Sequence, residues 1–325
     1  MTTAKSGPVD LVRFAVLDRA VCVLGQDLPG DNLRFLRGLD PEFFLYQASA
    51  HQHPDVGGAG ATRAALALRL NYSMAVEALF GMLGAVMQAP DCVFGWLSAY
   101  KNDELRGLVH RVSNGEPLKT LPPFRPTTWS QVSSALLEPL REQDTDRHAT
   151  VRDLFAKAWG IFASDLLSES SSREYNSLKH SFRVQPGSVT IDISHQGKSL
   201  LKSESALAHS FPFLRRTKER KNHYNVSYAT LALEPTFCAV ALSVIALSIN
   251  NAIAFARTRA GDTAPGVAVR FPESLELFEE LWKPRAPVAA LTYGGSVTIP
   301  DAEYWSDAEI LSVYDDAPDT EVTRD

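Results

Sequence analysis

The amino-acid sequence predicts a mostly helical protein of the α+β class: a helical bundle with a small antiparallel β-insertion before its last long helix. Residues 62–88 form a long, proline-free segment whose apolar residues recur at near-helical spacing. A second long apolar segment covers residues 236–256, and residues 181–233 between them change to the alternation typical of β-strands. Helical and strand patterns that are segregated along the chain in this way favour the α+β class.

Capping and breaking residues predict where each helix begins and ends. Asp40-Pro41-Glu42 is typical of a helix start, with Asp40 as the cap. The glycine-rich residues 51–61 predict a loop, and the helix over 62–88 follows. Residues 94–112 predict a second helix, which Ser113-Asn114-Gly115 ends.

Four prolines within residues 117–126 predict an extended connection to the later helices. A third helix is expected from residue 128 to about residue 137, with Thr127 or Thr128 as its cap. A fourth is expected from residue 150 to about residue 180, with an interruption at the polar run of residues 168–172.

The pattern after residue 180 predicts strands. Residues 181–194 alternate as a strand pair around Pro186-Gly187, and residues 222–233 predict a further strand. A short amphipathic helix is expected over residues 272–282 and a small hairpin over residues 291–300. The expected division is therefore an N-terminal helical and loop extension (1–61), the bundle (62–300) with its β-insertion at about 181–233, and an acidic C-terminal tail (301–325).

Composition limits the class of protein. The chain has 325 residues, of which 45% are hydrophobic and 22% charged, as in ordinary globular proteins. Its net charge of −6 argues against a generally basic nucleic-acid-binding surface but leaves room for a local basic patch. The N-terminal residues lack the apolar run of a signal peptide, and we expect a cytoplasmic protein.

The sequence indicates neither a cofactor nor a metal site. Cys22, Cys92 and Cys238 lie far apart among mostly apolar neighbours, which predicts buried free thiols rather than disulfides or zinc ligands. His51 and His53 lack further ligands at metal-binding spacing.

The apolar segment 236–256 has two interpretations. It is long enough to span a bilayer core of about 30 Å. Asn250 and Asn251 interrupt it, however, and serines and alanines dilute it, which favours a buried core helix.

The strongest candidate for chemistry is the stretch SSREYNSLKHSFRVQPG, from Ser171 to Gly187. On a helix, the spacing places Arg173, Asn176 and His180 on one face. Tyr175, Leu178 and Phe182 form the apolar side, which is expected to pack. Histidine exchanges a proton near neutral pH, and arginine can hold a phosphate. The alternative is a polar helix end in which His180 caps backbone carbonyls before the strand.

An arginine followed by six residues and a histidine, late in a helical bundle, resembles the motif of the HEPN superfamily. The run Asn-Ser-Leu-Lys-His at residues 176–180 and the helix with Asn71-Tyr72 and Glu77-Ala78-Leu79 are also similar to members of that superfamily. The resemblance covers residues 62–182, with the helix of residues 235–259 as a later bundle element. Glu174 follows the arginine where the family usually carries a small polar residue, and a carboxylate repels a phosphate.

The resemblance implies a homodimer in which two copies of the motif meet in a cleft. In active members this cleft cleaves RNA without a metal ion, and many other members only bind. Arg173 would then bind the scissile phosphate, and His180 would transfer the proton of the 2′-hydroxyl or of the leaving oxygen. Asn176 completes the set of candidate catalytic residues on this face.

A second candidate is a basic run between the expected strands, flanked by aromatic residues. Together with Lys179, its cations are candidate RNA-binding residues, because cations attract phosphates and aromatic rings stack on bases; they are Arg215, Arg216, Lys218, Arg220 and Lys221. The alternative is a solvated loop between strands.

Two further questions stay open at this point. Glu77 lies in an otherwise apolar helix, either on its solvated side or paired with an arginine such as Arg69 or Arg173. The chain as a whole is either a HEPN-like protein that binds or cleaves RNA, in stress or defence, or a non-catalytic helical protein that mediates dimerisation or partner binding. A membrane-associated protein built on residues 236–256 is the third alternative.

Overall fold

The computed structural model describes the larger part of the chain, namely residues 9–51, 59–124, 128–142, 144–179, 189–195, 198–205, 208–216, 224–232, 234–264, 268–272, 274–283, 306, 308–309 and 312. The chain divides into two compact units. The first comprises residues 1–181 and 233–286, and the second comprises residues 182–232 and 287–325. The first unit is the helical bundle, and the described part of the second contains two β-hairpins.

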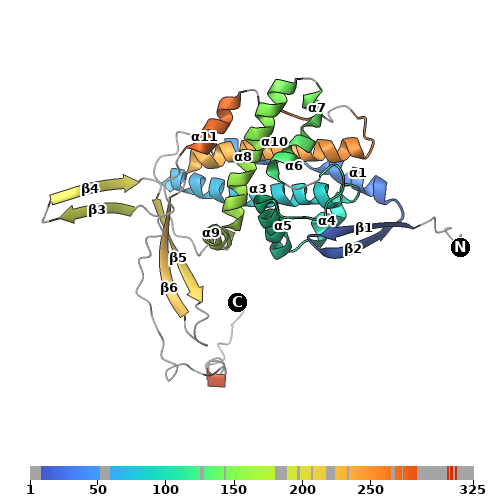
Figure 1. Ribbon diagram of the computed structural model, residues 1–325. Helices are drawn as coiled ribbons and strands as arrows, with labels where there is room; N and C mark the ends of the chain where they lie inside the picture. The colour runs from blue at the N-terminus through green and yellow to red at the C-terminus, as the bar shows by residue number, and fades with distance from the viewer. Residues whose placement is uncertain are drawn as a thin grey trace, which may run out of the picture. The chain divides into compact units, whose positions relative to one another are not determined.

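The first unit confirms the mostly helical prediction (Figure 1). It begins with an antiparallel hairpin of β1 (Asp10–Val16) and β2 (Arg19–Gly25). The helices follow in this order: α1 (Leu28–Gly38), α2 (Glu42–Ala50), α3 (Ala59–Gln88), α4 (Val93–Ala99), α5 (Asn102–Asn114), α6 (Trp129–Leu136), α7 (Glu138–Arg141), α8 (Thr145–Leu167), α9 (Glu169–Lys179), α10 (Pro235–Arg259), the 3₁₀-helix η1 (Leu275–Phe278) and α11 (Glu279–Trp282).

The described strands of the second unit form the expected β-insertion before the last long helix. β3 (Val189–His195) pairs antiparallel with β4 (Lys198–Ser205), and β5 (Ala208–Arg216) pairs antiparallel with β6 (Tyr224–Ala232). The pairing of β3 with β4 differs from the pairing expected across Pro186-Gly187, because alternation identifies a strand but not its partner. Residues 180–188, and the hairpin expected at residues 291–300, lie outside the described residues.

Two helix predictions need correction. The helix expected over residues 94–112 is divided into α4 and α5, because Tyr100 and Lys101 adopt extended backbone conformations. The Glu104 carboxylate accepts the Lys101 backbone N–H at 2.9 Å, which starts a new helix at this point. The helix expected to begin at Thr150 begins at Thr145, where the Asp144 side chain caps it by accepting the Arg147 N–H at 2.9 Å.

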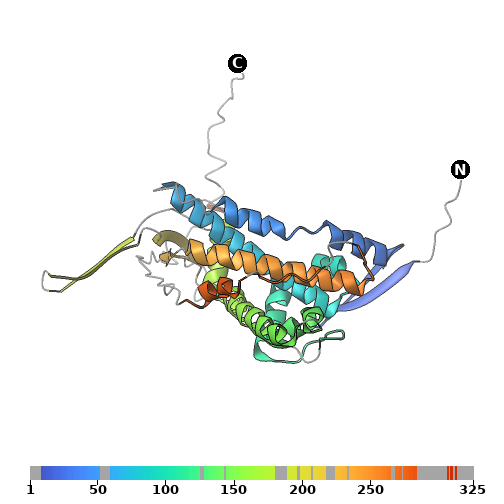
Figure 2. The same cartoon turned by 90° about the horizontal axis from the view of Figure 1, so that it is seen from above.

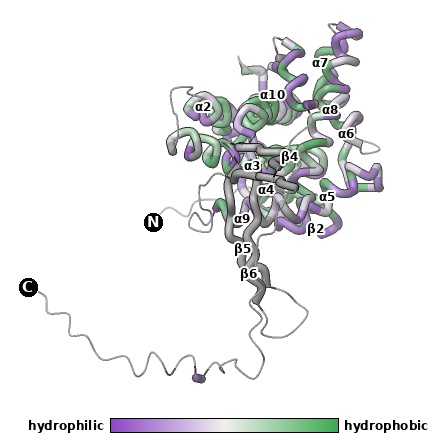
Figure 3. The backbone as a smooth tube through the Cα atoms, turned by 90° about the vertical axis from the view of Figure 1, so that its left-hand side faces the viewer, coloured by the Kyte–Doolittle hydropathy of each residue, from purple (hydrophilic) through white to green (hydrophobic). Residues whose placement is uncertain are grey.

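Helices α3 and α10 form the centre of the bundle. They lie side by side, with α2 along α10 (Figures 1 and 2). Fifteen of the 25 residues of α10 are buried, and residues 79–88 of α3 are all buried. Figure 3 shows hydrophobic residues concentrated on these two helices and hydrophilic residues on outer elements such as α7. The other helices of the unit pack their apolar residues against these two in one hydrophobic core, whose burial stabilises the fold.

Both central helices are long and apolar enough to cross a membrane. The candidate spans are Arg63–Gln88 and Pro235–Arg259, with 67% and 78% of their most apolar windows buried inside the protein. In α10, the side chain of the buried Asn251 forms two hydrogen bonds with the backbone of Arg270. Its side chain donates to the Arg270 carbonyl at 2.9 Å and accepts the Arg270 N–H at 2.7 Å, which fixes the segment of residues 268–272 to the helix.

The prediction of buried thiols holds for two of the three cysteines. Cys92 and Cys238 are buried, and burial raises the pKa of Cys238 to about 11. The prediction is wrong for Cys22, which is exposed. Cys22 lies on β2, where alternate side chains point away from the bundle.

Close packing of α3 against α4 depends on a glycine. A Cβ atom added at Gly84 would lie 2.6 Å from the ring of Trp96, which is fully buried. A Cβ atom at Gly160, in the middle of α8, would meet no atom within 4 Å.

We therefore expect opposite effects from the same substitution at these two glycines. Gly84→Ala should reduce the free energy of unfolding by about 1–3 kcal/mol, because it overpacks the contact with Trp96. Gly160→Ala should increase it by about 0.5–1 kcal/mol, because alanine has the higher helix propensity. Urea denaturation followed by circular dichroism measures both, and equal effects would contradict the described packing.

Candidate functional site

The stretch that carries the candidate motif forms a helix of its own. Ser168 has an extended backbone and ends α8, as the serine-rich run predicted. Its hydroxyl accepts the Ser171 N–H at 3.4 Å, and its carbonyl accepts the Ser172 hydroxyl at 3.0 Å. These bonds start α9 directly after the break, because serine satisfies the free N–H groups of a first helical turn.

Arg106 of α5 joins the end of α8 to the start of α9. Its guanidinium donates to the Leu166 carbonyl, to the Leu167 carbonyl at 2.7 Å and to the Ser172 hydroxyl at 2.6 Å. The last carbonyls of a helix lack partners within the helix, and a cation at this end is favourable. Arg106 therefore fixes the angle at which the chain enters α9.

A buried ion pair holds α9 against α3. The two oxygens of Glu174 accept from Nε and an Nη atom of Arg69, at 2.6 and 2.8 Å. Glu174 is 2% exposed, and the Arg69 side chain is 11% exposed. Burial alone would lower the pKa of Arg69, but the Glu174 carboxylate outweighs it, and the pKa of Arg69 lies well above its usual value.

The ion pair matters because α9 buries little apolar surface. Among its side chains that the structure describes, Leu178 is the one buried apolar residue, and Tyr175 is half-buried. Glu174 and Leu178 are four positions apart and so lie on the same side of the helix. The inward face of α9 therefore consists of one carboxylate and one leucine, with Tyr175 beside them.

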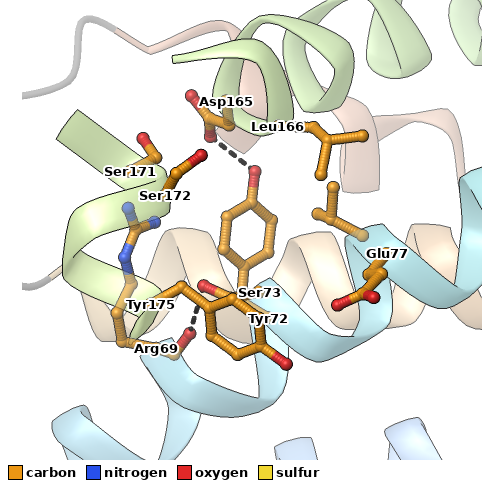
Figure 4. Close-up of a pocket in the computed structure, with 10 residues that line it drawn as sticks. Arg69, Tyr72, Ser73, Glu77, Asp165, Leu166, Ser171, Ser172 and Tyr175 are labelled. Carbon is orange, nitrogen blue, oxygen red and sulfur yellow. Dashed lines mark hydrogen bonds between the residues drawn. The ribbon is translucent and has the colours of Figure 1, made fainter. Parts of the chain in front are cut away.

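A small cavity lies between α3, the end of α8 and α9 (Figure 4). Its volume is about 50 Å³, and it is lined by Arg69, Tyr72, Ser73, Val76, Glu77, Asp165, Leu166, Ser171, Ser172 and Tyr175. The Tyr72 hydroxyl points toward Asp165 and donates to its carboxylate at 2.5 Å. The Arg69 guanidinium lies 5.2 Å from the centre of the Tyr72 ring. The cavity thus combines carboxylates, hydroxyls and aromatic rings.

Glu77 is the second acid that lines this cavity, besides Asp165. Burial and the negative charge of Glu77 raise the pKa of Tyr175, and the same two causes raise the pKa of Tyr100. Glu77 thus acts on the phenol of a tyrosine of α9 and on that of the tyrosine that caps α4. One alternative left open by the sequence was an ion pair between Glu77 and Arg69. That alternative is wrong, because Arg69 pairs with Glu174.

The candidate catalytic residues are only partly described. Arg173 and Asn176 lie on α9, and the Asn176 side chain is exposed. His180 and the side chain of Arg173 lie outside the described part of the structure. The convergence of Arg173, Asn176 and His180 therefore stays a prediction.

The candidate RNA-binding residues are also only partly described. Lys179 is exposed at the end of α9, with its ammonium group 6.0 Å from the centre of the Tyr175 ring. Arg215 and Arg216 end β5, opposite Asn225 and Tyr224 of β6. Lys218, Arg220 and Lys221 lie outside the described residues. Among the described residues, no group of three or more His, Cys, Asp or Glu side chains could hold a metal ion.

Sequence reasoning missed the partner of Arg69. The signal that could have found it is the spacing of Glu174 and Leu178, which marks an inward face on a helix with few apolar residues. No protein-family model matches this chain, and no curated protein or solved structure matches it either.

The buried ion pair yields a stability prediction. Glu174→Gln should reduce the free energy of unfolding by about 3 kcal/mol, because it leaves the Arg69 guanidinium buried without a countercharge. Asp153→Asn is the control: Asp153 is an exposed acid of α8 that pairs with the neighbouring Arg152, and its loss should cost less than about 1 kcal/mol.

A double variant separates the energy of the interaction between Arg69 and Glu174 from the effect of losing either side chain alone. Arg69→Met combined with Glu174→Leu removes both charges, so we expect it to cost much less than the sum of the two single substitutions. Additive losses, measured by urea denaturation, would show that the two side chains do not depend on one another.

Proposed function

We propose that this chain binds RNA and cleaves it by metal-independent acid–base chemistry, in the HEPN-like manner that its Arg173–His180 motif suggests. The observation that carries the proposal is the position of Glu174. Its carboxylate, adjacent in sequence to Arg173, is buried against α3 and matched by the charge of Arg69. The acid that would repel a phosphate is therefore turned away from solvent and neutralised.

Helix geometry supports an exposed position for the motif. Each residue of an α-helix is rotated by about 100° from the previous one, so Arg173 and Asn176 lie about 100° and 160° around the axis from the buried Glu174. Asn176 is exposed, as this rotation requires. Lys179 is exposed as well and adds a positive charge near the end of the helix. This face is suited to a polyanion.

The proposed reaction needs two groups. Arg173 holds the non-bridging oxygens of the scissile phosphate and stabilises the charge that develops on them. His180 takes the proton of the 2′-hydroxyl, whose oxygen forms a bond to phosphorus. The bond from phosphorus to the 5′-oxygen breaks, and the imidazolium returns its proton to that oxygen. The products are a 2′,3′-cyclic phosphate and a 5′-hydroxyl.

The basic run extends the proposed binding surface. Arg215 and Arg216 end β5, and the cations that follow them are close in sequence. Contacts to phosphates release counterions, so this contribution to binding should weaken steeply as salt rises. A second copy of the chain would bring a second motif to the same RNA.

An RNA cleavage assay tests the proposal. Wild-type protein should cleave RNA in the presence of EDTA, and Arg173→Ala and His180→Ala should each reduce the rate at least a hundredfold, because each removes a reacting group. The matched controls are Arg34→Ala and His110→Ala, which remove an exposed arginine and an exposed histidine of other helices and should leave the rate unchanged.

Uncut RNA with the folded wild-type protein would contradict the catalytic proposal, as would equal rates for His180→Ala and His110→Ala. That outcome would favour a non-catalytic protein that binds a partner or a second copy. One observation supports this second candidate. Phe43 and Tyr46 of α2 and Met74 of α3 are exposed apolar residues on helices that contact each other.

A further inference from the structure

The cavity beside α9 is too small for a nucleotide. A single water molecule needs roughly 10–15 Å³ of such volume, so 50 Å³ holds a few waters or one small chemical group. The cavity therefore cannot hold the RNA substrate proposed above. Its lining of two tyrosine rings, carboxylates and serine hydroxyls suggests a ligand of its own.

The positive and negative charges of the side chains that line the cavity do not cancel. Arg69 is the one cation among the described lining residues, and Glu174 matches its charge through two short hydrogen bonds. Glu77 forms no ion pair among the described residues. Glu77 and Tyr175 both line the cavity (Figure 4). Burial and the negative charge of Glu77 raise the pKa of the Tyr175 phenol, as expected for a carboxylate close to it. An anionic ligand is thus disfavoured here and a cation favoured.

The aromatic rings make the preference more specific. Tyr72 and Tyr175 both line the cavity, and Glu77 lies beside them (Figure 4). An ammonium group is attracted to the face of an aromatic ring as well as to a carboxylate. The serine hydroxyls and the oxygens of Asp165 can accept hydrogen bonds from its N–H groups, since a carboxylate oxygen can accept more than one.

We propose that this cavity binds the head of a small organic cation, an alkylammonium group, with Glu77 as its counterion and Tyr175 as its aromatic wall. The volume limits the site to the charged head, so the alkyl chain extends toward solvent. The ammonium group comes either from a free diamine or from a lysine side chain of a peptide.

Isothermal titration calorimetry with two probes tests the proposal at low ionic strength. Putrescine represents the free diamine, and a short peptide with one central lysine represents the side chain. Binding of either probe supports the site, and the tighter of the two identifies the source of the ammonium group. Butane-1,4-diol, which lacks the charges, and potassium chloride at matched ionic strength should give no binding.

Substitutions of the residues that line the cavity test whether the probes bind there. Glu77→Gln should weaken it at least tenfold, because it removes the countercharge and preserves the shape. Glu116→Gln removes an exposed acid at the end of α5 and should leave it unchanged. Tyr175→Phe keeps the ring and should retain binding, whereas Tyr175→Leu should lose it. The two tyrosine variants test the site even if Glu77→Gln fails to fold.

Three results would overturn the proposal: no binding of either probe to the folded wild-type protein, equal binding to wild type and Glu77→Gln, or equal binding of the diol. Because no measurement here involves RNA, failure of this site and failure of the proposed cleavage are distinguishable.

Discussion

The buried ion pair between Arg69 and Glu174 is the interaction on which the arrangement around α9 depends. A helix of this size usually docks through a stripe of apolar side chains. Among its described side chains α9 buries one apolar residue, Leu178, next to the charged Glu174, and Tyr175 is half-buried. A bidentate pair of charges has a narrow geometric optimum, so it fixes the rotation of the helix more strictly than apolar packing does.

Helix α3 contributes polar residues to the cavity along one part of its length and apolar residues to the core along another. Its middle part presents Arg69, Tyr72, Ser73 and Glu77 on the side that faces the cavity and α9, at spacings of three, four and eight residues. Its last ten residues are buried and apolar up to the final Gln88, and they form part of the centre of the core. Gln88 accepts the Leu17 N–H at 2.9 Å and donates to the Leu17 carbonyl at 3.0 Å, which fixes the turn of the β1–β2 hairpin.

Much of the fold follows from patterns that the sequence displays directly. The spacing of apolar residues predicted α3 and α10, and the Thr128 cap predicted the start of α6. The β1–β2 hairpin had no clear signal, because Leu17 occupies its turn with a φ of 55°, where a glycine or asparagine would have been expected. The division of α4 from α5 was also missed, since it depends on a hydrogen bond from the Lys101 N–H to Glu104 rather than on a breaking residue.

The site was predictable only in part. Helical spacing distinguished an exposed face with Asn176 from a packing face with Tyr175 and Leu178, and the structure agrees for those three residues. It could not show that Glu174 belongs to the packing face, because a carboxylate is buried only where a specific partner is available. That partner is 105 residues away in the sequence, and local sequence patterns do not predict contacts between residues so far apart.

The role assigned to the ion pair can be measured most directly by amide hydrogen exchange. If the pair holds α9 in place, Glu174→Gln should speed exchange in residues 169–179 at least tenfold beyond any change in the core of α10, because the helix then opens locally. Unchanged protection of α9 in that variant, or equal acceleration throughout the bundle, would contradict the account.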